Sequence, residues 1–306
     1  MSKNLWVVGD STLSSFEDKY YLPRYGYGTK LQEYLDDEII VKNIALSGRS
    51  SKSYTTEPEY QTLLSGMKKD DYLIIGFGHN DEKTENDRYT QGEGDYLTQG
   101  TFAFSLYNNY IKKAQEAGCI PILCTPIVRR SPDGKWNGQM LHVTAPVGEY
   151  KGGDYPKAIR DLARQLNIAL VDMTMMTKEM YDRLGADETL YLHAWPSDKA
   201  ISVDNTHTNV WGARVNAYLC LSEIKNIGVE GLSNHITGLE NDAPMPSKKK
   251  YFKPSETYKP TVFDSNLSDS KIWEKSGIWK PSVFGDIMDM PTKDTFTLEA
   301  LSDNSF

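Results

Sequence analysis

The sequence from Leu5 to Thr12, Leu-Trp-Val-Val-Gly-Asp-Ser-Thr, places a polar turn directly after an apolar run. An apolar run of this length is typical of a strand that is buried on both faces of a parallel sheet. Gly9 permits a sharp turn out of that strand, because it has no side chain to obstruct the turn. Ser11 is therefore expected at the carboxyl edge of the sheet, where open α/β sheets bind their ligands.

Four more apolar runs predict strands of the same kind along the chain. The five predicted strands cover residues 5–8, 39–45, 72–77, 120–125 and 169–172. Apolar residues at three- and four-residue steps predict helices over 100–118, 155–166 and 209–224. This alternation predicts an α/β fold, in which a five-stranded parallel sheet carries helices on both faces.

Composition excludes several classes of protein for this chain of 306 residues. The net charge of −8 disfavours a nucleic-acid partner, which requires a basic face. We expect no membrane span, because no apolar stretch approaches the ~18–20 residues that a span needs. Cys119, Cys124 and Cys220 form an odd set without Cys-x-x-Cys spacing, which argues against a disulfide framework and a structural zinc site.

The organisation of the chain predicts one main domain with an extension. Two long polar loops, 126–154 and 187–203, follow strand or helix ends on the expected ligand-binding face. From about residue 241 the sequence is richer in proline and shows no helical or strand periodicity. We therefore expect a main domain over 1–238, and an extension over 239–306 that packs on this domain or on a neighbouring subunit of a homo-oligomer.

Localisation is predicted from the residues before the first strand. Very few residues precede Leu5, which leaves no room for a signal peptide, so we expect a cytoplasmic protein. A secreted protein whose signal had been removed would have the same sequence.

Two polar motifs together predict nucleophilic catalysis. A serine hydroxyl is a poor nucleophile until a base takes its proton, and a carboxylate must orient that base. Ser11 provides the hydroxyl, and Asp204-Asn205-Thr206-His207 provides both other groups just before the last predicted helix. Taken alone, Ser11 could cap a helix, and Asp204 with His207 could form a cap or bind a metal ion. The metal interpretation lacks further ligands at suitable spacing.

Acyl transfer also needs donors for the negative oxygen of its intermediate. Gly48 follows the second predicted strand and offers an unobstructed N–H, and Asn80 follows the third and offers a side-chain amide. Individually these residues could be a left-handed turn and a loop brace. All of these motifs nevertheless fall at one edge of the predicted sheet.

The set Gly9-Asp10-Ser11, Gly48, Gly78-x-Asn80 and Asp204-x-x-His207 resembles the four blocks of the SGNH (GDSL) hydrolase superfamily. The resemblance covers roughly residues 3–228. The strings NIALSGRSSKSY, FGHND and DNTHTN, at 43–54, 77–81 and 204–209, are similar to the rhamnogalacturonan acetylesterase branch. The α/β-hydrolases, by contrast, carry Gly-x-Ser-x-Gly, which does not occur in this sequence.

The resemblance implies a flavodoxin-like, three-layer αβα sandwich that uses neither a metal ion nor a cofactor. It implies Ser11 as nucleophile, His207 as general base and acid, and Asp204 as the residue that orients His207. The implied oxyanion hole consists of the Ser11 N–H, the Gly48 N–H and Asn80 Nδ2. The implied reaction is the removal of acetyl groups from an oligo- or polysaccharide.

Residues for substrate binding are predicted from their chemistry. Arg49 and Arg129, with Lys52 and Arg130, could bind galacturonate carboxylates, because guanidinium groups bind carboxylates bidentately. Trp136 and Trp195 could stack on sugar rings, and His193 could line the groove. It is equally consistent with the sequence that the arginines are solvated and that the tryptophans anchor loops.

Three functional hypotheses follow from these residues. The first is an acetylesterase acting on pectin-derived rhamnogalacturonan. The second is an SGNH esterase of other specificity, such as an acetylxylan esterase, a lipase or a thioesterase. The third is a carbohydrate-binding protein without catalytic activity, which would not need the full set of catalytic groups.

Overall fold

The computed structural model describes residues 2–17, 23–186, 188–195 and 203–239. The predicted extension over 239–306 lies outside the described residues except for Leu239, and so does part of the loop 187–203. The boundary between main domain and extension stays a prediction.

The core of the fold is a sheet of five parallel strands in the order β2-β1-β3-β4-β7. This confirms the predicted α/β fold, with ends that differ from the prediction by a few residues. The chain passes from β1 to β2 on one side and then to β3 on the other, so the strand order reverses next to β1. Such a reversal creates the crevice in which open α/β sheets bind ligands. The strands are β1 Lys3–Gly9, β2 Ile39–Asn43, β3 Tyr72–Gly76, β4 Ile120–Cys124 and β7 Ala169–Val171.

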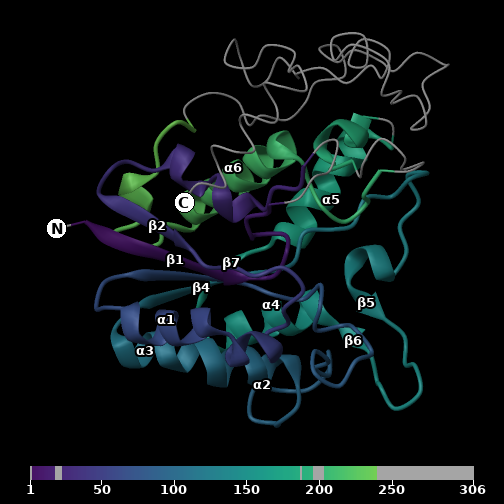
Figure 1. The fold of residues 1–306 in the computed structure, drawn as a ribbon, viewed down its shortest axis with the longest axis horizontal. Coiled ribbons are helices and arrows are strands. Elements are labelled where there is room, and N and C mark those ends of the chain that lie inside the picture. Colours follow the sequence, from purple (N-terminus) through teal and green to yellow (C-terminus); the bar gives the residue numbers. More distant parts are fainter. Residues whose placement is uncertain (1, 18–22, 187, 196–202, 240–306) are drawn as a thin grey trace.

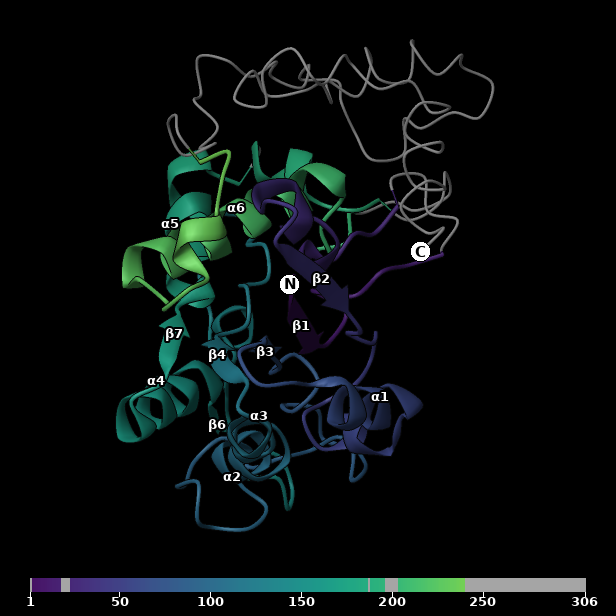
Figure 2. The same cartoon turned by 90° about the vertical axis from the view of Figure 1, so that its left-hand side faces the viewer.

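Both faces of the sheet are covered by helices, which produces three layers (Figures 1 and 2). One face carries α1 to α4, and the other carries α5 and α6. The central strand β1 is consequently apolar on both sides, with Leu5 and Val7 in one hydrophobic cluster and Trp6 and Val8 in the other. The helices are α1 Pro58–Gly66, α2 Phe102–Leu106, α3 Lys112–Ala117, α4 Tyr155–Leu166, α5 Met173–Leu184 and α6 Val210–Ile227.

The three predicted helices are present, and two further ones were not predicted. The segment predicted over 100–118 consists of α2, a π-helical turn over Tyr107–Ile111 and α3, and it ends at Gly118 with φ 74°. The sequence analysis missed α1 and α5. Short 3-10 helices occur at Tyr27–Thr29, Leu31–Tyr34, Ser53–Thr56, Gln139–Leu141, Glu188–Leu192 and Ser233–His235.

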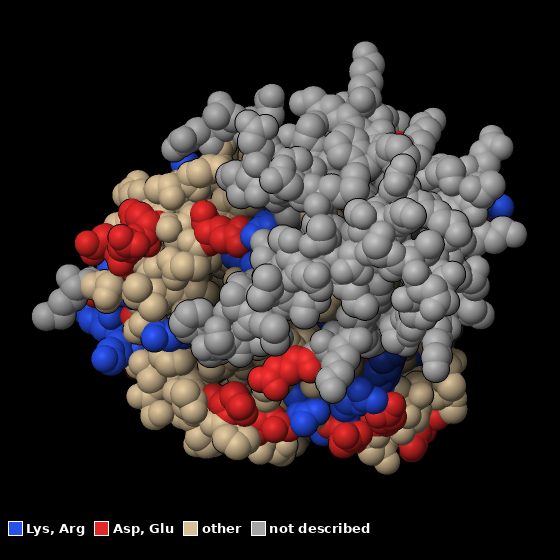
Figure 3. Space-filling model, turned by 45° about the horizontal axis from the view of Figure 1, so that its top comes forward, with Lys and Arg blue, Asp and Glu red and all other residues tan. Residues whose placement is uncertain are grey.

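The long loop between β4 and α4 contains a small antiparallel pair, β5 Val143–Thr144 and β6 Gly153–Asp154. This pair lies to one side of the main sheet (Figure 1). Within the described ranges, none of the helices has the length and apolar character needed to cross a lipid bilayer. On the face shown in Figure 3, the Lys and Arg side chains of the described residues are interspersed with Asp and Glu.

A close backbone approach shapes the end of β1. Gly9 pairs with Gly76 of β3, and a Cβ atom on Gly9 would lie 2.4 Å from the Gly76 carbonyl oxygen and 2.8 Å from Leu13 Cδ1. Any larger residue at Gly9 would therefore push the two central strands apart. The turn that carries Ser11 begins directly after this contact.

Candidate active site

The turn after β1 is organised by the carboxylate of Asp10. Asp10 Oδ1 accepts hydrogen bonds from the Thr12 N–H at 2.9 Å and the Thr12 hydroxyl at 2.8 Å. Asp10 Oδ2 accepts from the backbone N–H of His79 at 3.3 Å, which joins the turn to the end of β3. Burial raises the pKa of Asp10, although its hydrogen bonds from Thr12 and His79 oppose that rise. Asp10 thus anchors the turn that presents Ser11.

Ser11, His207 and Asp204 form a hydrogen-bonded series. Ser11 Oγ lies 2.9 Å from His207 Nε2, and His207 Nδ1 lies 2.7 Å from Asp204 Oδ2. The serine and the histidine are 196 residues apart in the chain. Phe16 meets the His207 ring edge-on, with the ring centroids 5.8 Å apart. A base within hydrogen-bond reach of a hydroxyl, itself oriented by a carboxylate, is the geometry that activates a serine.

Hydrogen bonds within the turn that begins at Asp204 keep its side chain ionised. Its Oδ1 accepts from the backbone N–H groups of Thr206 at 2.8 Å and His207 at 3.0 Å, while its Oδ2 meets the imidazole. Burial opposes the charge, but the hydrogen bonds and the positive potential of His207 outweigh it and lower the pKa of Asp204 to about 2. The carboxylate is therefore ionised at any pH near neutrality.

His193 supports this turn from inside the molecule. Its Nδ1 lies 2.8 Å from the Asp204 carbonyl oxygen and 3.0 Å from that of His207, and its Nε2 lies 2.7 Å from the Tyr181 hydroxyl. Two carbonyl acceptors at Nδ1 place the proton on that nitrogen. Burial, with the charge of Arg130, lowers the pKa of His193 to about 4, so the ring is neutral and braces the turn.

Two backbone N–H groups that are predicted to form the oxyanion hole make no hydrogen bond to any described residue. Within the part of the chain that the structure describes, neither the Ser11 N–H nor the Gly48 N–H has a hydrogen-bond acceptor. Gly48 has φ +77°, and a Cβ atom there would meet nothing within 4 Å. Its backbone conformation, rather than a lack of space, is what favours glycine at this position.

The Asn80 side chain is oriented by neighbours on both sides. Its Oδ1 accepts from Arg88 Nη1 at 3.1 Å, and its Nδ2 donates to the Arg49 carbonyl oxygen at 3.1 Å. The amide nitrogen keeps a second hydrogen for another acceptor. The hydrogen bond to Arg49 joins the loop after β2 to the loop after β3.

A buried carboxylate strengthens the same junction. Asp81 accepts from the backbone N–H of Ser51 at 3.1 Å and from the Thr90 hydroxyl at 2.9 Å. Burial raises the pKa of Asp81 to about 7, while the hydrogen bonds from Ser51 and Thr90 oppose the rise. The loops that carry Gly48 and Asn80 are thus tied to each other beneath the surface.

The residues predicted to bind substrate are dispersed in the structure. Arg49 pairs with Glu57, and Trp136 packs against α5, where its Nε1 donates to Asp182 Oδ1 at 2.7 Å. His193 and Trp195 are buried, with exposed fractions of 0% and 1%. A sugar ring cannot reach His193 and Trp195 in this structure, so the expectation that they contact substrate needs correction. His193 is buried beneath the Asp204–His207 turn, whose carbonyl oxygens its Nδ1 contacts.

Arg129 and Arg130 are also engaged within the protein. Arg129 forms an ion pair with the buried Glu82, and its Nη1 donates to the Gln139 carbonyl oxygen at 2.7 Å. Arg130 donates to the Thr189 hydroxyl at 2.9 Å and to Asn205 Oδ1 at 3.0 Å, within the Asp204–His207 turn. Neither guanidinium is a free cation for a galacturonate carboxylate.

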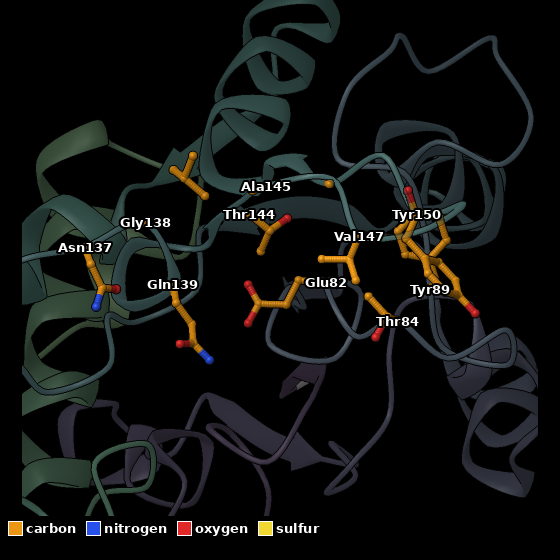
Figure 4. Close-up of a pocket in the computed structure, with 12 residues that line it drawn as sticks. Glu82, Thr84, Tyr89, Asn137, Gly138, Gln139, Thr144, Ala145, Val147 and Tyr150 are labelled. Carbon is orange, nitrogen blue, oxygen red and sulfur yellow. The ribbon is translucent and has the colours of Figure 1, made fainter.

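A cavity that the sequence did not predict is lined by residues of the segment that follows Asn80. Figure 4 shows the side chains that line it. Glu82, Tyr89, Gln139 and Tyr150 contribute to its lining. The only available signal was that Glu82 directly follows the FGHND string. The partners of Glu82 come from a loop about 50 residues away, so no local pattern could reveal them. No group of three or more His, Cys, Asp or Glu side chains in the described segments could hold a metal ion.

A serine, an imidazole and a carboxylate in hydrogen-bonded series at the carboxyl edge of an α/β sheet characterise the serine hydrolases. The model of the GDSL-like lipase/acylhydrolase family matches residues 7–230. This chain belongs to the GDSL-like lipase/acylhydrolase family, and it is an esterase. The resemblance drawn from the four sequence blocks is thereby confirmed.

Individual relatives are similar over most of the chain. The rhamnogalacturonan acetylesterase RhgT of Bacillus subtilis (strain 168) is 28% identical over 246 residues, which cover 77% of this chain and 95% of that protein. The probable rhamnogalacturonan acetylesterase YesY of the same organism is 30% identical over 230 residues, with 75% and 95% covered. The crystal structure of Bacillus subtilis YxiM superposes with a TM-score of 0.58 at 22% identity, over 76% of this chain and 58% of that one. This structural likeness shows the shared fold.

Proposed function

We propose that this chain is a carbohydrate esterase that removes acetyl groups from rhamnogalacturonan saccharides, with Ser11, His207 and Asp204 as its catalytic triad. One observation carries the proposed catalytic mechanism: Ser11 Oγ, His207 and Asp204 are joined by contacts of 2.9 and 2.7 Å at the carboxyl edge of the sheet. The unoccupied N–H groups of Ser11 and Gly48, with Asn80 Nδ2, supply the donors that acyl transfer needs.

In the first half of the reaction, His207 Nε2 takes the proton of Ser11 while Oγ bonds to the acetyl carbonyl carbon. The carbonyl electron pair moves to its oxygen, which accepts hydrogen bonds from the Ser11 N–H, the Gly48 N–H and Asn80 Nδ2. His207 then gives its proton to the sugar oxygen as the ester bond breaks. The sugar leaves with a free hydroxyl, and Ser11 is acetylated.

In the second half, a water molecule takes the place of the sugar oxygen. His207 removes its proton as the water oxygen bonds to the acetyl carbon, and returns the proton to Ser11 Oγ as acetate departs. Asp204 keeps the proton of the neutral ring on Nδ1 and stabilises the imidazolium that forms twice in each cycle.

The choice of rhamnogalacturonan is supported by the relatives rather than by the triad. RhgT and YesY are both named for this substrate, and each is matched over 95% of its length. The triad by itself could hydrolyse any ester, so it does not select a substrate. Acetylated xylan is therefore the comparison substrate that separates this proposal from an SGNH esterase of other specificity.

The proposal is tested by measuring acetate release from acetylated rhamnogalacturonan and acetylated xylan in parallel, with wild type and Ser11→Ala. We expect release from rhamnogalacturonan, and a decrease of more than about 10⁴-fold in Ser11→Ala with unchanged thermal unfolding. Release from xylan alone would assign a different substrate. A folded wild type that hydrolyses neither glycan nor 4-nitrophenyl acetate would refute catalysis by this triad.

A further inference from the structure

A cavity of about 440 Å³ opens next to the loop that carries Asn80. Its lining comes from residues 82–89, after β3, and from residues 137–152 of the long loop before α4. Its volume lies in the range of pockets that bind small organic ligands. Glu82 is two residues from Asn80, so their Cα atoms are at most about 7 Å apart. The cavity is therefore next to the loop that carries Asn80.

One wall of the cavity is aromatic. Tyr89 and Tyr150 meet edge-on, with their ring centroids 4.8 Å apart, on the same side of the cavity (Figure 4). The Tyr150 hydroxyl donates to Asn86 Oδ1 at 2.9 Å, and the Tyr89 hydroxyl accepts from the Lys151 N–H at 3.0 Å. The rings are thus held in place, and a fixed aromatic surface packs well against the C–H groups of a sugar ring.

The rest of the lining combines amides with apolar side chains. Asn137 and Gln139 lie across the cavity from the two tyrosines (Figure 4), and amides both donate hydrogen bonds to hydroxyl groups and accept them. Val143 and Val147 also line the cavity, although they are 41% and 58% exposed. Exposed valines in a cavity wall offer a place for an apolar edge of a ligand.

The charge at the base of the cavity is already balanced by the protein. Glu82 pairs with Arg129 through one oxygen and lies 3.2 Å from His142 Nδ1 through the other. Burial opposes the charge of Glu82, but His142 and Arg129 lower its pKa below the ordinary value, so the carboxylate is ionised. Lys and Arg side chains are absent from the described lining. A ligand carboxylate would thus meet Glu82 without a free cation to receive it.

We propose that this cavity is a subsite for an uncharged sugar unit that neighbours the acetylated one, an inference that rests on the proposed function. A deoxyhexose such as rhamnose matches the lining of the cavity. Its hydroxyls can form hydrogen bonds with Asn137 and Gln139, and its methyl group can pack against the valines. Its ring would pack on Tyr150. A galacturonate unit would bring a second carboxylate next to Glu82, so it should bind there more weakly.

The first test compares Tyr150→Ala with the control Leu97→Ala, because Leu97 is 71% exposed and does not line the cavity. The measurement is kcat/KM for an acetylated rhamnogalacturonan oligosaccharide divided by kcat/KM for 4-nitrophenyl acetate, which is too small to need the subsite. We expect this ratio to fall about tenfold or more in Tyr150→Ala. It should be unchanged in Leu97→Ala.

The second test measures binding directly by ligand-observed NMR in a Ser11→Ala background. Methyl rhamnoside and galacturonic acid are titrated separately, with and without Tyr150→Ala. We expect methyl rhamnoside to bind and Tyr150→Ala to weaken that binding. Galacturonic acid should bind more weakly than methyl rhamnoside.

An unchanged ratio of kcat/KM values in Tyr150→Ala would overturn the assignment of the subsite. Tighter binding of galacturonic acid, also lost in Tyr150→Ala, would overturn its preference for an uncharged sugar. If the wild type cleaves 4-nitrophenyl acetate but no rhamnogalacturonan, the proposed substrate fails. The subsite is then decided by the methyl rhamnoside titration alone.

Discussion

At the scale of single residues, Asp204 determines which nitrogen of His207 carries the proton. Its Oδ1 accepts from two backbone N–H groups and its Oδ2 faces His207 Nδ1, so the ring keeps its proton on Nδ1 and offers Nε2 to Ser11 as a base. In Asp204→Asn, the amide oxygen can keep the turn, while the NH₂ group would face Nδ1. The proton would then move to Nε2, where it blocks the acceptance of the Ser11 proton.

We therefore expect Asp204→Asn to lower kcat on 4-nitrophenyl acetate by about 10⁴-fold while the protein stays folded. The measurement is steady-state kinetics at pH 7, with circular dichroism as the control for folding. A kcat within tenfold of the wild type would show that Asp204 does not set the tautomer of His207.

We predict that the stability of the protein depends on pH through His193. The pKa of His193 of about 4 lies below the value of about 6.5 in an unfolded chain. Between these two values the unfolded chain binds more protons than the folded one. The free energy of unfolding should therefore decrease as the pH falls from 6.5 to 4. Denaturant unfolding at several pH values measures this slope, which should be smaller in His193→Gln. Equal slopes in the two proteins would exclude His193 as a source of it.

At the scale of elements, the N-terminus of α6 is built into the site. Asn209 Oδ1 accepts from the N–H groups of Trp211 at 3.0 Å and Gly212 at 3.1 Å, while its Nδ2 donates to the His193 carbonyl oxygen at 3.0 Å. The same side chain thus caps the helix and joins it to the residue that braces the catalytic turn. The capping residue of another described helix is not joined to His193 in this way.

The matched comparison is Asn209→Ala against Thr101→Ala, since Thr101 caps α2 by accepting from the Phe104 N–H at 3.0 Å. Each substitution should cost about 1 kcal/mol or more in the free energy of unfolding, which denaturant titration measures. Only Asn209→Ala should also lower kcat on 4-nitrophenyl acetate, because it releases the support of the His207 turn. If both substitutions changed kcat equally, the Asn209 cap would have no specific role in catalysis.

At the scale of the whole molecule, the sheet, both helical layers and the three residues of the proposed triad all lie within residues 2–239. A chain ending at Leu239 is therefore expected to keep its hydrolysis of 4-nitrophenyl acetate. The proposal that the extension joins subunits predicts that this shortened chain forms assemblies of fewer subunits, which light scattering measures. An unchanged number of subunits would refute that role, and loss of hydrolysis would show that the extension contributes to the site.

Much of this architecture was predictable because its signals are local. The strands predicted over 120–125 and 169–172 are present as Ile120–Cys124 and Ala169–Val171, because short apolar runs flanked by polar turns favour buried strands. The helix at 155–166 has both a clear apolar face and capping residues at its ends. The helices α1 and α5 were missed because α1 buries only Tyr60 and Leu63, and α5 places Thr174 and Thr177 among its buried residues, so neither buries a continuous apolar stripe.

The sequence by itself determined the strand pattern, the family blocks and the residue types that acyl transfer requires, because each of these is a property of short segments. Only the tertiary structure decided that Ser11 Oγ and His207 Nε2 are 2.9 Å apart, that His193 is buried and that Arg129 is paired with Glu82. Burial and ion pairing depend on which distant segments pack together. Hydrogen bonds between distant loops and the packing of both sheet faces bring those segments to one edge.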